Sequence, residues 1–314
     1  MNKFTIIPAD NFIWNQSELT RFLVAHQGQD IVISTREEGC CLTSIGLYKL
    51  LDLFTFKSVN IETNNIFENH NKYNITFTNP FKFFTLRELF DYTKYHNWNG
   101  NTVFGGLYNR AIWHRIGLTA HLHKYSSTLN FRSNPHNEDA RRLFELQRLF
   151  DIDPNSVVKF MDIVKQLPIQ LETADGYTIV NTTVGHTDQL AEFYPNFLID
   201  IVAETFTSGH TFFATEKTIR PMLMKKPFII MGPKCFLIHL RQMGFKTFND
   251  YWDEDYDGYS PSDRYKKILI LLDDISKKSI SELENTYNSM QNILNHNYDL
   301  LIEQSYNKQL KYIK

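Results

Sequence analysis

The sequence contains little cysteine. Three of its 314 residues are Cys: Cys40 and Cys41 are adjacent, and Cys235 stands alone. Three thiols cannot form a disulfide framework or a four-cysteine zinc site, so we expect unpaired thiols in a reducing compartment, the cytoplasm. No His/Asn constellation accompanies Cys40, and we therefore interpret Cys40 and Cys41 as small buried residues rather than nucleophiles.

Long apolar runs and an excess of one charge are also absent. No eighteen apolar residues follow one another, so we expect no membrane span. Residues 1–10 have neither the apolar segment nor the cleavage site of a signal peptide, so we expect no signal peptide. Lys and Arg number 33 against 35 Asp and Glu, a formal charge of −2. This balance creates no overall positive field that would recruit nucleic acid or a membrane surface.

Apolar residues make up 42% of the chain and aromatic residues 14%, with 25 Phe and 16 Tyr. This composition is typical of a globular chain, and the length suggests two domains of roughly 150 residues each. The abundant Asn, Lys and Ile have AT-rich codons, which indicates a low-GC genome, viral genomes included. A viral protein of this kind would act in the host cytoplasm.

Strand patterns alternate with helical patterns over the first hundred residues. Apolar runs predict strands at residues 4–7, 30–34, 58–61 and 73–77. Helical spacing predicts a helix that Ser17 caps, a second helix through residues 45–54, and a third after the capping box at 85–88. Such an alternation is typical of a parallel α/β sheet.

A polar break at residues 96–101 predicts the boundary between an N-terminal domain, residues 1–97, and a C-terminal domain, residues 98–314. Beyond it the patterns predict a strand at 102–106, a helix through 112–118, a helix from Pro154, and strand-like segments at 228–231 and 267–272. A capping box at Ser279 opens one long amphipathic helix, which we expect to close the fold.

The segment from Thr215 has the features of a phosphate-binding helix start. Thr215 can cap a helix whose first turn contains Glu216 and Lys217, and Pro221 shortens or kinks that helix. A helix N-terminus presents unpaired N–H groups and the positive end of the dipole to an anion. One acid and seven bases between 216 and 246 give this stretch a net charge of +6: Lys217, Arg220, Lys225, Lys226, Lys234, Arg241 and Lys246. We interpret Lys225, Lys226 and Lys234 as solvated loop residues.

Five segments in order resemble the donor-binding half of a group of nucleotide-sugar glycosyltransferases: residues 202–205, 213–218, 226–229, 244–248 and 253–257. The group is that of GT-B glycosyltransferases from phages, large DNA viruses and bacteria, distantly similar to the α-1,3-fucosyltransferases with their Thr-Glu-Lys at a helix start. The match covers roughly residues 100–270. It implies two Rossmann-like domains that face each other across a cleft, the GT-B architecture.

The resemblance also implies roles for single residues. Glu216 would bind the ribose hydroxyls of the donor and Lys217 its phosphate, beside Thr215, while Glu204 stands where such enzymes place another donor-facing acid. Arg110 or Arg115 would neutralise the leaving diphosphate. The donor is then a nucleoside-diphosphate sugar, with no further cofactor. The Asp-x-Asp spacing at 253–257 is compatible with a metal site. Because GT-B enzymes generally need no bound metal, we expect no metal site here.

The catalytic base is predicted from topology. Residues 35–39 leave the second parallel strand at its carboxyl end, the edge that faces a ligand in such sheets. Glu38 or Glu37 in this loop is the best candidate for deprotonating an acceptor hydroxyl, and His186 is a second candidate. A solvated loop acid is the alternative interpretation of both glutamates.

Three functions remain open on the sequence. The first is sugar transfer to a hydroxyl acceptor on a glycan or similar molecule. The second is the same chemistry on a hydroxymethylated base of phage DNA, which would require base flipping and salt-dependent DNA binding. The third is a nucleotide-binding protein that kept the fold and lost the chemistry.

Overall fold

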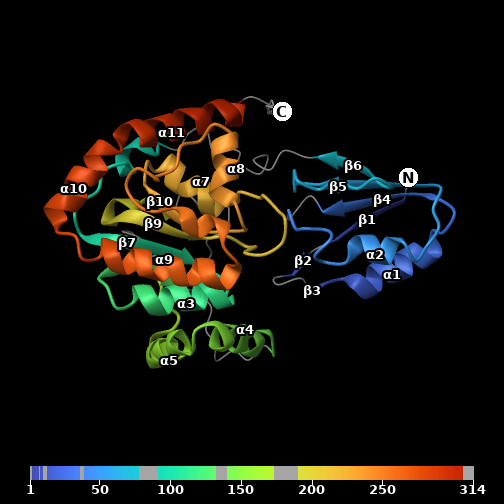
Figure 1. Cartoon of the computed structure of the whole chain (residues 1–314), viewed down its shortest axis with the longest axis horizontal. Coiled ribbons are helices and arrows are strands. Elements are labelled where there is room, and N and C mark those ends of the chain that lie inside the picture. Colours follow the sequence, from blue (N-terminus) through green and yellow to red (C-terminus); the bar gives the residue numbers. More distant parts are fainter. Residues whose placement is uncertain are drawn as a thin grey trace.

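The computed structural model is a mixed α/β protein with two four-stranded parallel sheets (Figure 1). It describes residues 2–6, 8–9, 13–35, 39–77, 91–131, 140–172 and 190–306. One hydrophobic core is formed by residues between Ile6 and Tyr73 together with Phe206, and the other by residues from Tyr92 to Leu301. The division that we predict after residue 97 stays a prediction; Phe67 and Tyr92 already pack on the second core.

The first sheet has the strand order β1-β4-β5-β6, with every pair parallel. Its strands are β1 (Asn2–Thr5), β4 (Asp30–Thr35), β5 (Ser58–Thr63) and β6 (Asn74–Phe77). The helices α1 (Gln16–Ala25) and α2 (Leu47–Leu51) lie side by side below it in Figure 1, and a short antiparallel pair joins β2 (Pro8–Ala9) to β3 (Ile13–Trp14). The strand predicted at 30–34 is confirmed, and α1 begins after Asn15 rather than at Ser17.

The second sheet has the order β10-β9-β7-β8 and is also parallel. Its strands are β7 (Thr102–Tyr108), β8 (Ser127–Phe131), β9 (Phe197–Ala203) and β10 (Phe228–Met231). The chain passes outward from β7 to β8 and then returns to the other side of β7 for β9. The strand order therefore reverses between β7 and β9, and in open α/β sheets ligands bind at the carboxyl ends of strands at such a switch point.

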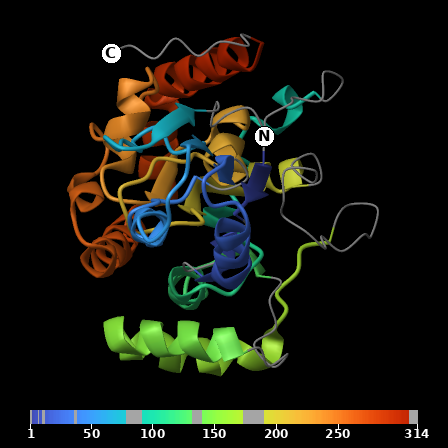
Figure 2. The ribbon, with the colours of Figure 1, turned by 90° about the vertical axis from the view of Figure 1, so that its right-hand side faces the viewer.

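Helices cover both faces of the second sheet. Above it in Figure 1 lie α7, α10 and α11, and below it lie α3 and α9, on which α4 and α5 form an outer layer that Figure 2 also shows. The helices are α3 (Trp113–Leu122), α4 (Ala140–Ile152), α5 (Pro154–Ile163), α7 (Glu216–Leu223), α8 (Phe236–Gln242), α9 (Pro261–Ile275), α10 (Ile280–Ser289) and α11 (Gln291–Tyr306). Short 3-10 turns occupy η2 (Thr93–Tyr95), η3 (Val164–Gln166), η5 (Tyr194–Asn196) and η6 (Asp255–Gly258).

Two predictions about this half were wrong. Residues 267–272 form part of α9 rather than a strand, because Ser260 caps the helix at the Asp263 N–H and Ile268 and Leu272 are buried at helical spacing while Ile270 is exposed. The capping box at Ser279 is present, but the helix that it opens ends at Ser289 and a second helix follows. The Ser289 hydroxyl donates to the Thr286 carbonyl at that end, and such local bonds compete with the helix.

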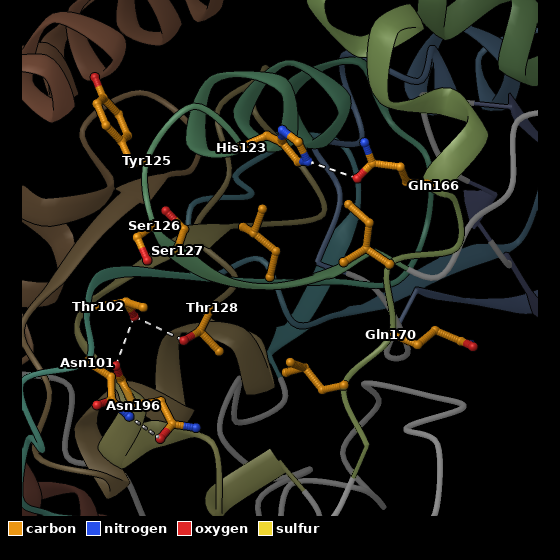
Figure 3. Close-up of a pocket in the computed structure, with 13 residues that line it drawn as sticks. Asn101, Thr102, His123, Tyr125, Ser126, Ser127, Thr128, Gln166, Gln170 and Asn196 are labelled. Atoms are coloured by element: carbon orange, nitrogen blue, oxygen red, sulfur yellow. Dashed lines mark hydrogen bonds between the residues drawn. The ribbon is translucent and has the colours of Figure 1, made fainter.

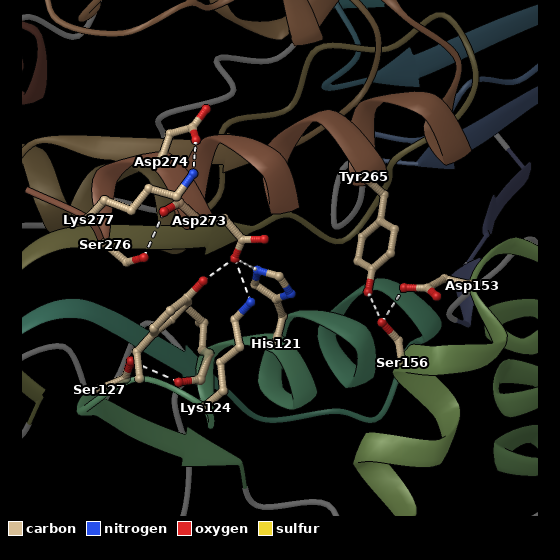
Figure 4. A network of polar contacts seen from close by, with 12 residues as sticks. His121, Lys124, Ser127, Asp153, Ser156, Tyr265, Asp273, Asp274, Ser276 and Lys277 are labelled. Carbon is tan, nitrogen blue, oxygen red and sulfur yellow. Dashed lines mark hydrogen bonds and ion pairs between the residues drawn. The ribbon is translucent and has the colours of Figure 1, made fainter.

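A polar network fixes α3 against α9 and α5 (Figure 4). The Asp273 carboxylate of α9 lies 2.9 Å from His121 Nε2 of α3, and it accepts from Lys124 at 2.5 Å and from the Tyr125 hydroxyl. On the same helices Tyr265 shares a 2.8 Å hydrogen bond with Ser156 of α5. These contacts hold in place the helix that carries Arg115.

The segment between β9 and α7 joins the two halves. Phe206 is buried in the first core, Asn65 Nδ2 donates to the His210 carbonyl at 2.9 Å, and the Phe212 N–H donates to Asn65 Oδ1 at 3.2 Å. Asn65 follows β5, and Thr211 donates to the carbonyl of Gly39, which follows β4. The carboxyl end of the first sheet therefore contacts the loop that leaves the carboxyl end of the second.

Gly209 lies in the loop between β9 and α7, and its substitution tests the contact between this loop and the first half. Its φ is +84°, and a Cβ there would lie 2.8 Å from the Cys41 Cβ. We expect Gly209→Ala to lower the free energy of unfolding by about 2–4 kcal/mol, through both backbone strain and overlap with the first core. Gly28→Ala is the control, since Gly28 has φ +74° with open space around it and should lose only about 1 kcal/mol. Equal losses in urea unfolding would contradict the contact.

Lys226 is buried rather than solvated as predicted. Its ammonium donates to the Asn97 carbonyl at 3.0 Å and lies 5.5 Å from the centre of the Tyr287 ring. Burial lowers the pKa of Lys226 from 10.5 to about 7. The unfolded chain therefore binds the Lys226 proton more tightly than the folded protein does. Burial of Lys226 lowers the free energy of unfolding by its full amount below pH 7, and this cost decreases as the pH rises from 7 and is lost above 10.5.

We accordingly expect Lys226→Met to stabilise the protein by roughly 2–4 kcal/mol at pH 6. The gain should shrink to less than about 1 kcal/mol at pH 10, because the unfolded lysine is then losing its proton. Thermal unfolding at the two pH values measures it, with the exposed Lys246→Met as control. A gain independent of pH would contradict a buried cation at this position.

Candidate functional site

The residues of the predicted donor site meet at the switch point of the second sheet. Arg115 of α3, which follows β7, donates from Nε and Nη2 to the carbonyl of Ala203, the last residue of β9, at 3.2 and 3.1 Å. Its neighbour His114 donates from Nε2 to the Glu204 carbonyl at 3.0 Å. The first turn of α3 is thus bound directly to the start of the loop that leads into α7.

Glu204 anchors the N-terminus of α7. Its side chain is buried, Oε1 accepts from the Thr215 N–H at 3.1 Å and from the Thr218 hydroxyl at 2.6 Å, and Oε2 accepts from the Thr215 hydroxyl at 2.6 Å. Both carboxylate oxygens are therefore engaged with α7. This geometry gives Glu204 a role in positioning the helix start, and direct contact with a donor stays a prediction.

Thr215 caps α7 as its sequence context predicts. Its side chain accepts from the Lys217 N–H at 3.3 Å, and α7 has only eight residues, with Pro221 inside. The same hydroxyl accepts from Lys217 Nζ at 3.1 Å. The cap, the first turn and the lysine ammonium are therefore held together as one unit.

Glu216 and Lys217 form an ion pair at this helix start. Lys217 Nζ lies 2.7 Å from Glu216 Oε1, and the two side chains are 15% and 14% exposed. Burial raises the pKa of Glu216, but the charges of Lys217 and Arg220 outweigh it and leave the pKa below its ordinary value. A carboxylate, a group that can accept hydrogen bonds from hydroxyls, and an ammonium, a group that can bind a phosphate, thus stand side by side and are each partly exposed.

Further cations surround the pair. Burial lowers the pKa of Arg115 to about 10, although the charges of Glu216 and Glu204 raise it, and the charge of Arg110 lowers it further, so the other three groups all act on Arg115. Arg110 is exposed just after β7. Arg115 thus lies close enough to Glu216 for their charges to interact, and Arg110 lies close enough to Arg115 for the same.

The inner side of α7 is fixed by Arg220. This buried side chain faces Asp200 in β9, whose Oδ2 accepts from the Tyr194 hydroxyl at 2.7 Å. Burial raises the pKa of Asp200 to about 6, although the charge of Arg220 and the Tyr194 hydrogen bond lower it. Arg220 therefore binds α7 to the sheet, and its charge still reaches Glu216.

The other bases of the +6 segment lie elsewhere. Lys225 donates to Asn295, Lys226 lies at the amino end of β10, and Arg241 pairs with Glu254 at 3.0 Å. The acidic run is structural, since Asp257 accepts from the Leu237 N–H at the start of α8. Over the described ranges no group of His, Cys, Asp and Glu could hold a metal ion. Cys40 and Cys41 are buried, as predicted.

The candidate bases Glu37, Glu38 and His186 lie outside the described residues. The residues that flank the two glutamates do belong to the structure. Thr35 ends β4, and a Cβ on Gly39 would lie 2.6 Å from the Phe213 Cβ, two residues before Thr215. The carboxyl end of β4 thus reaches the loop that leads into α7.

Two cavities of about 590 Å³ adjoin the second sheet. One lies at the amino ends of β7 and β8 and is lined by Asn101, Thr102, Ser127, Gln166 and similar side chains (Figure 3). As far as the described residues go, its lining has no Lys or Arg, so it does not suit a diphosphate. The other lies at the carboxyl edge, and its residues His210, His239 and Arg264 carry no local sequence signal that would have identified them.

Compared with known proteins, the chain matches no family model and no curated protein. Within the part of the chain that the structure describes, no helix has the length and apolar character to cross a membrane.

Proposed function

We propose that the protein is a glycosyltransferase of GT-B architecture, which transfers a sugar from a nucleoside-diphosphate sugar to a hydroxyl acceptor without a bound metal. The observation that carries this proposal is the Glu216–Lys217 pair at the N-terminus of α7, at the switch point between β7 and β9. An open α/β sheet binds nucleotides at this position, on helix N-termini.

The charges suit each part of the donor. Glu216 accepts hydrogen bonds from two vicinal ribose hydroxyls, while the Lys217 ammonium binds the diphosphate at the positive dipole end of α7. Negative charge develops on the diphosphate as the bond to the sugar breaks. Lys217, Arg115 and Arg110 supply fixed positive charge near it, which stabilises the leaving group in the transition state.

The contact between the two halves supports the architecture. The loop after β9 is bonded to Gly39 and Asn65 at the carboxyl ends of β4 and β5. An acceptor bound on the first half would then face the donor. Glu38 or Glu37, in the loop after β4, is the base that we propose for the acceptor hydroxyl.

Thermal shift with UDP-, GDP- and CMP-sugars tests this function. One nucleotide class should raise the melting temperature, because a ligand that binds only the folded state stabilises it. The stabilising donor should then be hydrolysed or transferred. Stabilisation without turnover would indicate a non-catalytic nucleotide-binding protein, and the absence of any shift would contradict the proposal.

A further inference from the structure

A cavity with cationic side chains in its lining lies at the carboxyl edge of the second sheet. The middle of the loop between β9 and α7 forms one wall, and the segment after β10 together with the start of α9 forms the rest of this cavity of about 590 Å³. Lys234, His210, His239 and Arg264 line it. Among its described lining residues there is no Asp or Glu. A cavity with this lining favours an anion.

The Arg264 guanidinium has more N–H donors than acceptors among the described residues. It is completely buried, Nη1 donates to the carbonyls of Thr207 and Gly232 at 3.0 and 2.5 Å, and Nη2 donates to the Tyr259 carbonyl at 2.6 Å. A guanidinium carries five N–H donors, and Nε has no partner among the described residues. A buried donor without an acceptor is costly, and Arg264 is one of the residues that line the cavity.

The nearest acid compensates Arg264 only in part. Burial lowers the pKa of Arg264, and the charge of Asp257 raises it without restoring its ordinary value. The Oδ2 atom of Asp257 is itself engaged by the N–H groups of Leu237 and Ile238 at the start of α8. The guanidinium therefore retains uncompensated positive charge beside the cavity.

The N-terminus of α9 adds to this charge. Ser260 and Pro261 line the cavity at the start of a fifteen-residue helix, whose positive dipole end favours an anion. Asp263, the acid of the first turn, is held by the Ser260 hydroxyl at 2.7 Å. Exposed Lys234, which follows β10, also belongs to the lining.

Rings line the rest of the cavity. Tyr259, His210 and His239 contribute flat surfaces, and Phe67 from the first half lies 5.1 Å from the His210 ring and 4.0 Å from the His239 ring. A few donors in a wall that is otherwise apolar and aromatic are typical of small-molecule sites. The volume exceeds that of a bare ion and is sufficient for a ring compound.

We propose that this cavity binds a phosphate-bearing small molecule, a sugar or nucleoside phosphate monoester, at a site separate from the Lys217 site. The phosphate lies between Lys234, Arg264 and the start of α9, and the ring of the ligand lies against Tyr259 and the two imidazoles. Three phosphate oxygens match donors that come from several directions. This proposal does not depend on the glycosyltransferase function.

Titration of ribose 5-phosphate, inorganic phosphate and sulfate at constant pH and ionic strength tests it, with the imidazole NMR signals of His210 and His239 as the readout. We expect saturable shifts, with ribose 5-phosphate at least tenfold tighter than inorganic phosphate. Lys234→Ala should weaken binding at least tenfold, while Lys217→Ala and the exposed Lys246→Ala should leave it unchanged.

Three results would overturn the proposal: no saturable shift, an adventitious anion site with equal affinity for all three probes, or loss of the shift in Lys217→Ala. The readout is independent of sugar transfer. Nucleotide-sugar binding without phosphate-monoester binding would refute this inference alone, and the reverse result would refute the glycosyltransferase proposal alone.

Discussion

Lys217→Ala is expected to lower kcat/KM for the nucleotide-sugar donor about 100-fold, which corresponds to about 2.7 kcal/mol of transition-state stabilisation. The reason is that Lys217 holds the positive charge at the N-terminus of α7, where its ammonium bonds to Thr215 and Glu216. A phosphate would replace the Glu216 contact with a charge-assisted bond of similar strength. Steady-state kinetics with the stabilising donor measures the loss.

The matched control is Lys246→Ala, which removes another lysine of the same charged stretch from an exposed position. It should retain the activity of the unaltered protein. Because the loss of Lys217 leaves Glu216, which is 14% exposed, without its ion-pair partner, the melting temperature should fall by a few degrees, and the kinetics are measured well below it. Turnover in Lys217→Ala within threefold of that of the unaltered protein would refute the position that we give the phosphates.

Glu204→Ala is expected to destabilise the protein by about 3–5 kcal/mol, since three buried donors lose their acceptor and buried Arg115 loses a neighbouring negative charge. The melting temperature should fall by roughly 10 °C. The stabilisation by a nucleotide should also disappear, because α7 is no longer anchored to β9. Thermal unfolding with and without the donor measures both effects.

Thr218→Val provides the comparison for Glu204. It keeps the shape of the side chain and removes one of the three hydrogen bonds, so it should lose only about 1–1.5 kcal/mol and retain donor binding. If Glu204→Ala destabilised no more than Thr218→Val, the carboxylate would not be the anchor of α7.

Local signals predicted the elements around the site well. The run at residues 30–34 is a strand because its apolar side chains are buried, and Thr215 and Ser279 cap helices because their hydroxyls reach the N–H groups of the following turn. Each of these features depends on residues within four positions of one another. The sequence alone was sufficient for them.

Features that depend on distant parts of the chain could not be predicted in this way. Lys226 resembles a loop lysine, but its ammonium meets a carbonyl of residue 97 and the ring of residue 287. Glu204 follows a strand, as a ligand-facing acid would. Its carboxylate, however, accepts hydrogen bonds from Thr215 and Thr218, which lie eleven and fourteen residues further along the chain at the start of α7. Arg264 faces a cavity that three separate segments build.

Phosphorus NMR of the protein with its stabilising nucleotide sugar shows whether the protein breaks the bond between the sugar and the diphosphate. We expect the signals of the sugar-linked diphosphate to be replaced by those of the free nucleoside diphosphate, faster with an acceptor present, and Lys217→Ala to slow this change about 100-fold. Sugar-linked signals that persist unchanged for every nucleoside-diphosphate sugar, with the protein folded, would refute sugar transfer by this protein.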